Sequence, residues 1–208
     1  MCLLKKNLFK KQIEMKILPT GFEGLKIIQS EVYKDYRGFF KEDYKKKIFK
    51  NKNFIFGCTS SSKKNVLRGM HLQTKFAQEK YVSVLKGSIL DVVVDLRKKS
   101  KTFGKYFNIT LSDENAKSLF IPAGFAHGFL GLKKENIIYY HCTNYRSAKH
   151  EVGILWNDKD LNIKWPIKKP IVSKKDKKNF SFQEFKNLFL WKKLKKLKLN
   201  LLIAQVEN

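Results

Sequence analysis

His71 and its polar neighbours are the residues of this sequence best suited to chemistry. In the stretch VLRGMHLQ (66–73), Arg68 and His71 stand among apolar residues that are typical of a buried strand. A histidine can take up and return a proton near neutral pH, and a carboxylate behind it can fix its tautomer. Lys80 could stabilise an oxyanion, and a tyrosine could act as an acid. His71 could therefore be a proton carrier, a metal ligand or a structural histidine in a core.

The residues around His71 argue against a metal site. A metal in a small β-barrel needs about three or four converging ligands, commonly two histidines one residue apart with a carboxylate and a further histidine. Here Gln73 occupies the second histidine position, Lys80 stands where a carboxylate would be useful, and only His127 remains as a partner. We therefore expect no metal and no cofactor, and the residues favour proton chemistry.

The segments around these residues resemble short β-strands. Residues 81–97 contain two β-branched runs joined through Gly87, a pattern that predicts a hairpin. Further strand-like runs follow at short, regular spacing, at residues 105–111, 118–125, 127–132 and 136–145. This repetition predicts an all-β antiparallel sandwich or barrel, with a jelly roll as the expected form.

The two ends of the chain differ from this central part. Residues 1–14 form a lysine-rich extension that precedes Met15, which could be the true start. Residues 183–208 place apolar side chains at three- and four-residue steps among lysines, which predicts a basic amphipathic helix. We expect this helix to pack on its own sheet or on a partner subunit, with contact to a membrane surface as the less favoured alternative. Residues 15–182 would then form the single main domain.

The composition indicates a soluble cytoplasmic protein. The chain has 208 residues, 43% of them hydrophobic, and no apolar run approaches the roughly 20 residues that span a bilayer. Its opening residues have neither the apolar run nor the cleavage site of a secretory signal. The three cysteines, Cys2, Cys58 and Cys142, are too few and too scattered for a disulfide framework, so we expect reduced thiols.

The net charge of +26 is a weak argument for nucleic-acid binding. The 44 basic residues include only four arginines, and the lysines are spread along the whole chain. Specific recognition of phosphates and bases usually relies on arginine, and no known nucleic-acid-binding motif is present. We therefore expect only nonspecific, salt-sensitive attraction to nucleic acid.

Six stretches together resemble the dTDP-4-dehydrorhamnose 3,5-epimerase family in order and approximate spacing. They are KDYRGFFKE (34–42), VLRGMHLQ (66–73), QEKYVSVLKGSILDVVVDLRKKSKTFGKY (78–106), LSDEN (111–115), IPAGFAHGF (121–129) and ILWNDKDLNIKWP (154–166). The resemblance covers about residues 15–180. It implies a cupin-type jelly roll, a double-stranded β-helix with short helices at the termini. It also implies a metal-independent enzyme, usually a homodimer, that acts on a nucleotide-linked 4-keto-6-deoxy sugar.

The resemblance implies a role for each of several residues. His71 would be the base that removes a proton beside the C4 ketone, and Asp176 would orient it. Lys80 would hold the C4 oxyanion, and Tyr140 would be the acid on the other face, with its neighbour Tyr139 as the alternative. The residues expected to bind the substrate are Arg37, Glu42, Arg68, Gln73, His127 and Arg146. The first two would do so across the dimer interface.

Three positions depart from the family's pattern. Phe56 and Cys58 stand in a stretch where the family usually carries amides, and Arg146 stands where a tyrosine is common. These positions are expected to surround the ligand, so they bear on which sugar or nucleotide binds more than on the reaction class. The alternatives are an enzyme that inverts one centre only, a 3,4-ketoisomerase of the same fold, and a cupin that binds a ligand without catalysis.

Overall fold

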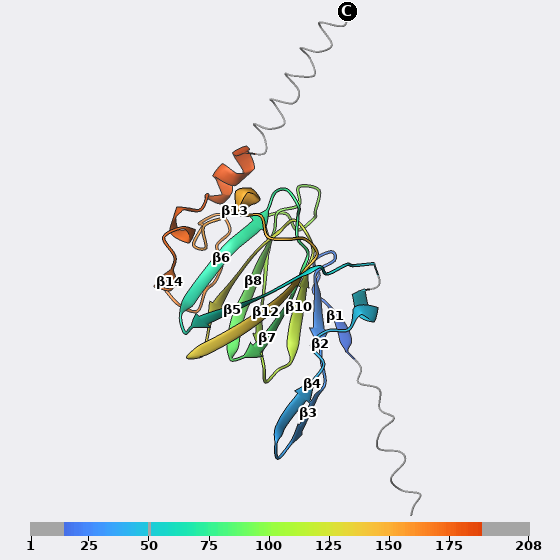
Figure 1. The fold of residues 1–208 in the computed structure, drawn as a ribbon. Coiled ribbons are helices and arrows are strands. Elements are labelled where there is room, and N and C mark those ends of the chain that lie inside the picture. The colour runs from blue at the N-terminus through green and yellow to red at the C-terminus, as the bar shows by residue number, and fades with distance from the viewer. Residues whose placement is uncertain (1–14, 50, 189–208) are drawn as a thin grey trace, which may run out of the picture.

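Two antiparallel sheets packed face to face make up most of the molecule (Figure 1). The computed structural model describes residues 15–49 and 51–188. The first sheet runs in the order β1 (Lys16–Pro19), β2 (Lys26–Gln29), β10 (Lys117–Ile121), β7 (Lys80–Lys86), β12 (Glu135–Cys142) and β5 (Phe56–Lys63). The second runs in the order β13 (Glu151–Gly153), β6 (Val66–Gln73), β11 (Phe125–Gly131), β8 (Ser88–Asp95) and β9 (Tyr106–Ser112), and β14 (Ile171–Val172) pairs in parallel with β6. The predicted all-β fold is confirmed.

The main core lies between the inner faces of the two sheets. Val82 and Ile138 from the first sheet pack with Val93 and Phe129 from the second, and all four are almost completely buried. Alternate residues of a strand face opposite sides of its sheet, so the β-branched runs of the sequence supply this inner face. The described residues also form three short 3-10 helices: η1 (Lys46–Phe49), η2 (Ala148–His150) and η3 (Asp176–Lys178).

The hairpin predicted for residues 81–97 is wrong. β7 pairs with β10 and β12 in the first sheet, whereas β8 pairs with β11 and β9 in the second. The tight connection at Gly87 therefore carries the chain from one sheet to the other. Gly87 has a φ of +84°, and a Cβ at this position would lie 2.1 Å from the Glu135 carbonyl oxygen. Local patterning identifies both strands but not their partners.

A bulge in β6 lets Arg68 and His71, which are three residues apart, face the same side of the sheet. In a regular strand, residues three apart face opposite sides of the sheet. In the β6–β11 ladder His71 pairs with His127 and Arg68 pairs with Phe129, so three steps on β6 oppose two on β11. The extra residue brings both side chains to one side, where they line the same cavity. Gly69 makes this possible, because a Cβ there would lie 2.5 Å from the Gly128 Cα.

The chain after β13 covers the outer face of the second sheet. A capping box, in which Ser181 and Glu184 bond to each other's backbone N–H, begins a helical segment at residues 182–188. Phe182 and Phe185 pack from this segment into a second core cluster. The start of the predicted amphipathic helix therefore packs on its own domain. Residues 1–14 and 189–208, which hold the predicted N-terminal extension and the rest of the predicted C-terminal helix, lie outside the described residues.

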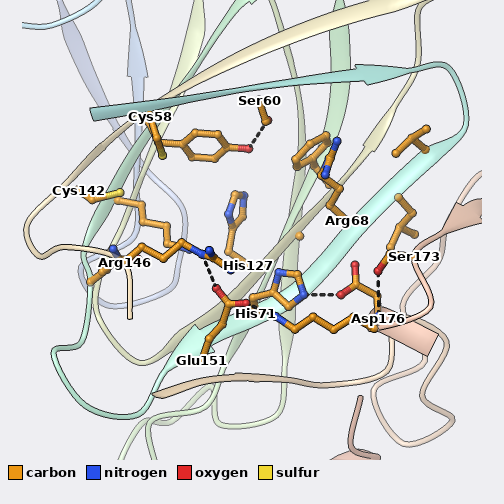
Figure 2. Close-up of a pocket in the computed structure, with 18 of the residues that line it drawn as sticks. Cys58, Ser60, Arg68, His71, His127, Cys142, Arg146, Glu151, Ser173 and Asp176 are labelled. Carbon is orange, nitrogen blue, oxygen red and sulfur yellow. Dashed lines mark hydrogen bonds and ion pairs between the residues drawn. The ribbon is translucent and has the colours of Figure 1, made fainter. Parts of the chain in front are cut away.

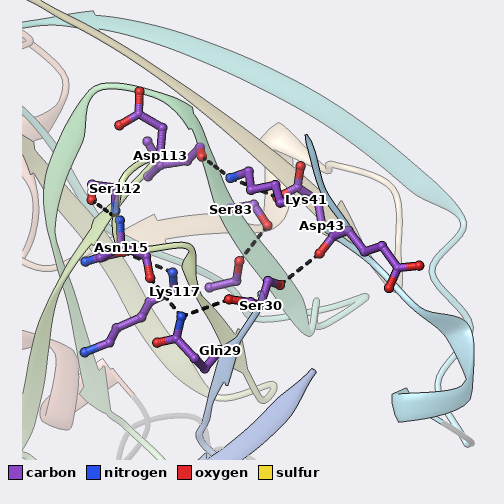
Figure 3. Close-up of polar contacts among 12 residues, drawn as sticks. Gln29, Ser30, Lys41, Asp43, Ser83, Ser112, Asp113, Asn115 and Lys117 are labelled. Atoms are coloured by element: carbon purple, nitrogen blue, oxygen red, sulfur yellow. Dashed lines mark hydrogen bonds and ion pairs between the residues drawn. The ribbon is translucent and has the colours of Figure 1, made fainter. Parts of the chain in front are cut away.

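The hairpin of β3 (Val32–Asp35) and β4 (Gly38–Lys41) projects from the body of the domain (Figure 1). Its base is fixed: Lys41 Nζ donates to the Val84 carbonyl (3.0 Å) and pairs with Asp43 (3.1 Å), and Ser30 Oγ donates to the Glu42 carbonyl (2.8 Å) (Figure 3). Along the hairpin the exposed apolar side chains are Tyr33, Tyr36, Phe39 and Phe40. The domain therefore presents an apolar surface on a firmly anchored element.

Candidate active site

A cavity of about 570 Å³ opens between the two sheets and collects most of the predicted site residues (Figure 2). One wall comes from β5, β7 and β12, and the other from β6 and β11. The segment around η3 closes one side. The predicted residues that line the cavity are His71, Lys80, Tyr140, Asp176, Arg68, His127 and Arg146. Residues far apart in the sequence therefore meet in one volume.

Strand register determines which side chains of the first wall face the cavity. Tyr140 lies directly between Cys58 of β5 and Val82 of β7, and Cys142 lies between Phe56 and Lys80. Because side chains alternate along a strand, residues 139 and 141 face the other side of this sheet. There the Tyr139 ring packs edge-on against the His141 ring, with centroids 4.7 Å apart. Tyr140 is therefore the tyrosine that the fold directs into the cavity.

His71 and Asp176 form a hydrogen-bonded pair on the opposite wall. His71 Nε2 lies 2.6 Å from Asp176 Oδ1, and the Asp176 side chain is almost fully buried whereas His71 is partly open to the cavity. Burial alone would raise the pKa of Asp176, but hydrogen bonds from His71 and from the Gly69 N–H lower it. Asp176 is thus a carboxylate that fixes the ring of His71, and the second ring nitrogen remains able to take up a proton.

Tyr140 is a buried phenol at the other side of the same cavity. Its hydroxyl lies 3.1 Å from Ser60 Oγ. Burial raises the pKa of Tyr140 well above its ordinary value, although the hydrogen bond with Ser60 acts in the other direction. The phenol therefore carries its proton at neutral pH and can donate it.

A second histidine–carboxylate pair lies between these two groups. His127 Nε2 is 2.8 Å from Asp91 Oδ2, and both side chains are buried. The His127 ring packs edge-on against the Tyr140 ring, with centroids 6.2 Å apart. Asp91 was missed in the sequence, where it appears only as a polar residue inside the apolar run of β8. It fixes the orientation of His127 beside Tyr140.

Positively charged groups surround these residues. Arg68 donates to Ser62 Oγ (2.9 Å) and to the Ser61 carbonyl (3.1 Å), which holds its guanidinium in place. Lys80, Arg146 and Lys175 also line the cavity. Such a set of cations suits a ligand with phosphate groups.

Glu151 is a second residue that sequence reasoning missed. It accepts hydrogen bonds from Arg146 (3.2 Å) and from Lys175. Burial works to raise the pKa of Glu151, but Lys175, Arg146 and the nearby His71 lower it. As a carboxylate it fixes two of the cavity's cations. Its position three residues before Ile154, at the edge of a predicted motif, gave no signal of this function.

Three predicted substrate-binding residues lie outside the cavity. The Gln73 amide donates to the Phe76 carbonyl (2.8 Å) and accepts from the Ser147 N–H (2.6 Å), so it fixes two loops. Arg37 lies on the projecting hairpin and pairs with Asp35 at 2.6 Å. Glu42 lies at the hairpin's base and pairs with Lys45. The binding role of these three residues stays a prediction.

The described residues contain no group of three or more His, Cys, Asp or Glu side chains that could hold a metal ion. The histidines of the cavity are instead each bonded to an aspartate, at His71 and His127. Within the same described ranges, no helix is long and apolar enough to cross a membrane.

Comparison with known proteins decides the family. Residues 19–184 match the family described as dTDP-4-dehydrorhamnose 3,5-epimerase. The chain belongs to this family. The family's enzyme from Methanothermobacter thermautotrophicus is 43% identical over 171 residues, which cover 79% of this chain and 92% of the relative. The enzyme from Shigella flexneri is 42% identical over 168 residues, with 78% and 93% covered.

Solved structures of sugar-nucleotide epimerases share this fold. The 3,5-epimerase from Legionella pneumophila, in complex with dTDP-4-keto-L-rhamnose, is 39% identical with a TM-score of 0.78, over 81% of this chain and 93% of that one. A 3'-monoepimerase from Streptomyces bikiniensis, in complex with dTDP-quinovose, is 26% identical with a TM-score of 0.78, over 86% and 97%. The predicted cupin-type jelly roll is confirmed by these likenesses.

The three departures from the family pattern all line the cavity. Phe56 and Cys58 lie on β5, and Arg146 follows β12. The aromatic ring of Phe56 packs edge-on against the exposed ring of Tyr145, with centroids 6.0 Å apart. These positions belong to the wall around the ligand space, whereas the pair of His71 and Asp176 lies on the facing wall.

Proposed function

We propose that this protein inverts C3 and C5 of a dTDP-linked 4-keto-6-deoxy sugar, as a dTDP-4-dehydrorhamnose 3,5-epimerase. One observation carries the proposal: the pair of His71 and Asp176 and the protonated phenol of Tyr140 face one cavity from opposite sheets. Inversion requires a proton to leave one face of a carbon and another to arrive on the opposite face. The family membership supports the same reaction.

His71 is the base of the proposed reaction. The C–H bonds at C3 and C5 flank the C4 ketone, so loss of either proton gives an enolate rather than a bare carbanion. Asp176 orients the ring of His71 and stabilises its charged form after proton transfer. Lys80, which lines the cavity one strand away from Cys142, supplies a positive charge for the C4 oxyanion.

Tyr140 is the acid that completes the inversion. Its buried phenol keeps its proton at neutral pH and projects from the wall opposite His71. Donation to the enolate carbon from that side produces the inverted centre. Ser60, within hydrogen-bond distance of the hydroxyl, holds the phenol in position.

The cations of the cavity bind the nucleotide diphosphate in this proposal. Arg68 presents a guanidinium that Ser61 and Ser62 hold in place, and guanidinium groups form paired charged hydrogen bonds with phosphate oxygens. The cavity volume of about 570 Å³ lies within the usual range for small-molecule sites. The positive charge would also attract a dianionic ligand from solution.

Deuterium incorporation tests the proposed reaction directly. The full chain, incubated with dTDP-4-keto-6-deoxyglucose in deuterium oxide, should place deuterium at both C3 and C5 of the sugar, as read by NMR. Exchange at C3 alone would favour a single-site epimerase, like the S. bikiniensis relative. A shifted carbonyl would identify a ketoisomerase. No exchange with this substrate, although dTDP binds, would leave a ligand-binding cupin.

We propose that the functional unit is a homodimer built on the β3–β4 hairpin. Tyr36, Phe39 and Phe40 are 97%, 53% and 59% exposed on this hairpin, whose base is anchored by Lys41. Contiguous exposed apolar side chains of this kind mark interaction surfaces. A second copy is the proposed partner because Arg37, on the same hairpin, lies outside its own cavity and would reach the partner's.

The mass of the particle in solution tests the dimer. By light scattering after gel filtration, the wild-type chain should have twice the mass of one chain, and a Phe39→Asp/Phe40→Asp double variant should have the mass of one. The control is Phe76→Asp, which changes an equally exposed aromatic ring outside the hairpin. A double variant that stays dimeric would contradict the proposal. Circular dichroism would verify that both variants are folded.

A further inference from the structure

Two thiols that the proposed reaction does not use lie next to each other in the cavity wall. Cys58 lies opposite Tyr140 in the β5–β12 ladder and Cys142 lies opposite Phe56, so the cysteines are diagonal neighbours on one face of the sheet. Both are free, and both line the cavity. Figure 2 shows them on the same side of the cavity.

The surroundings make the two thiols chemically unequal. The hydrogen bond with Cys142, together with the charges of Lys80 and Arg146, lowers the pKa of Cys58 to about 7 despite its burial. The hydrogen bond with Cys58, together with burial, raises the pKa of Cys142. Cys58 is half-buried, whereas Cys142 is buried. The pair therefore consists of an accessible thiolate and a protonated thiol beside it, an arrangement typical of reactive cysteines.

We propose that Cys58 and Cys142 form a peroxide-reactive dithiol whose oxidation inactivates the site in the cavity. The Cys58 thiolate attacks a hydroperoxide, an S–O bond forms as the O–O bond breaks, and the departing oxygen takes a proton to leave as water or an alcohol. Cys142, losing its proton, then attacks the sulfenic sulfur. The S–S bond forms as the S–O bond breaks, and the hydroxyl group leaves as water with the proton that Cys142 loses. The peroxide is reduced by the two electrons that the thiols lose.

The disulfide would act on the site through the strands that it joins. Its sulfur atoms must come to about 2 Å from each other, which draws β5 and β12 together at the diagonal. These strands carry Ser60 and Tyr140, whose hydroxyl groups lie 3.1 Å apart. Cys142 is also the cross-strand neighbour of Lys80. Oxidation therefore displaces the proposed acid and the proposed oxyanion group, and it removes the thiolate charge beside them.

Peptide mapping tests the thiol chemistry independently of any sugar reaction. The full chain in a Cys2→Ser background, treated with hydrogen peroxide at pH 7 and then alkylated, should give a proteolytic fragment in which residues 58 and 142 are linked. A reducing agent should separate it. With a pKa near 7, about half of Cys58 is thiolate at this pH, roughly tenfold more than for an ordinary thiol. Alkylation of Cys58 in untreated protein should be correspondingly faster than that of free cysteine.

Variants separate the two roles within the pair. Cys142→Ser should still lose the free thiol at residue 58 but form no link, and Cys58→Ser should leave Cys142 unmodified by the same treatment. Deuterium exchange, expressed relative to each variant's own untreated rate, should fall at least about tenfold on oxidation only in the chain with both cysteines, and it should recover on reduction. Circular dichroism before and after treatment would verify folding.

The results of these peroxide and exchange experiments either support or overturn the dithiol proposal. A linked peptide with reversible loss of exchange supports the proposal. Peroxide that leaves both thiols free, or that modifies Cys142 equally well in Cys58→Ser, overturns it, as does a linked protein that keeps its full exchange rate. If the untreated chain shows no exchange, the proposed function fails. In that case two results decide the thiol proposal separately: whether the linked peptide forms, and whether the disulfide changes dTDP binding as measured by calorimetry.

Discussion

Replacing His71 with asparagine should lower the rate of proton exchange at the sugar by about 10² to 10⁴-fold. An asparagine side chain is polar and close in size, but it has no nitrogen that takes up a proton near neutral pH. The asparagine amide can still donate a hydrogen bond to the buried carboxylate of Asp176, which limits the loss of stability. The measurement is deuterium incorporation at C3 and C5, which should decrease at both positions together.

A matched substitution separates this effect from a general disturbance. His150 lies on η2, where Nδ1 is 2.8 Å from Ser147 Oγ, and its side chain is not among those lining the cavity. His150→Asn should therefore exchange at the wild-type rate. If His71→Asn retains wild-type exchange while its thermal unfolding is unchanged, another group must be the base. Tight binding of dTDP by the variant would show that its cavity is still formed.

Replacing Tyr140 with phenylalanine should separate proton removal from inversion. The base on the facing wall is untouched, so deuterium should still enter the substrate, returned on the face from which the proton left. The inverted product should decrease by about 10² to 10⁴-fold, because no acid remains on the other face. NMR of the sugar reads both quantities in one sample. The wild type should show exchange and inversion together.

Tyr139, the residue next to Tyr140, supplies the control for this experiment. Its ring packs against His141 on the outer side of the sheet, so Tyr139→Phe removes the same atom without touching the cavity. We expect inversion at close to the wild-type rate. Inversion lost in Tyr139→Phe and kept in Tyr140→Phe would exchange the roles of the two residues. Equal losses in both would point to a disturbed strand rather than to a missing acid.

Seven of the ten site residues predicted from the sequence face the cavity. His71, Lys80, Tyr140 and Asp176 were assigned to one site from motifs in distant segments, and the fold brings them together. Their chemical roles remain to be tested by the substitutions above. The choice between Tyr139 and Tyr140 needed the register of β12, because neighbouring positions on a strand differ only in the face that they occupy.

What could not be predicted depends on contacts between distant segments. The partners of β7 and β8 are set by non-local pairing, so two adjacent strands joined at Gly87 resembled a hairpin although they belong to different sheets. Gln73 has the right type and spacing for a ligand contact, but its amide is bonded to loop backbone. Asp91 and Glu151 act through His127 and Arg146, and no local pattern links those pairs.

At the extra residue in β6, the stability of the sheet and the activity of the site place opposite demands on the chain. A β6 that kept these residues but paired regularly with β11 along its whole length would place Arg68 and His71, three positions apart, on opposite faces of the sheet. One of the two side chains would then leave the cavity and lie on the face of the apolar cluster around Met70 and Val92. Selection for a more stable sheet would therefore act against the irregularity on which the site depends. Gly69, which has no side chain to clash with Gly128, is the residue that keeps it.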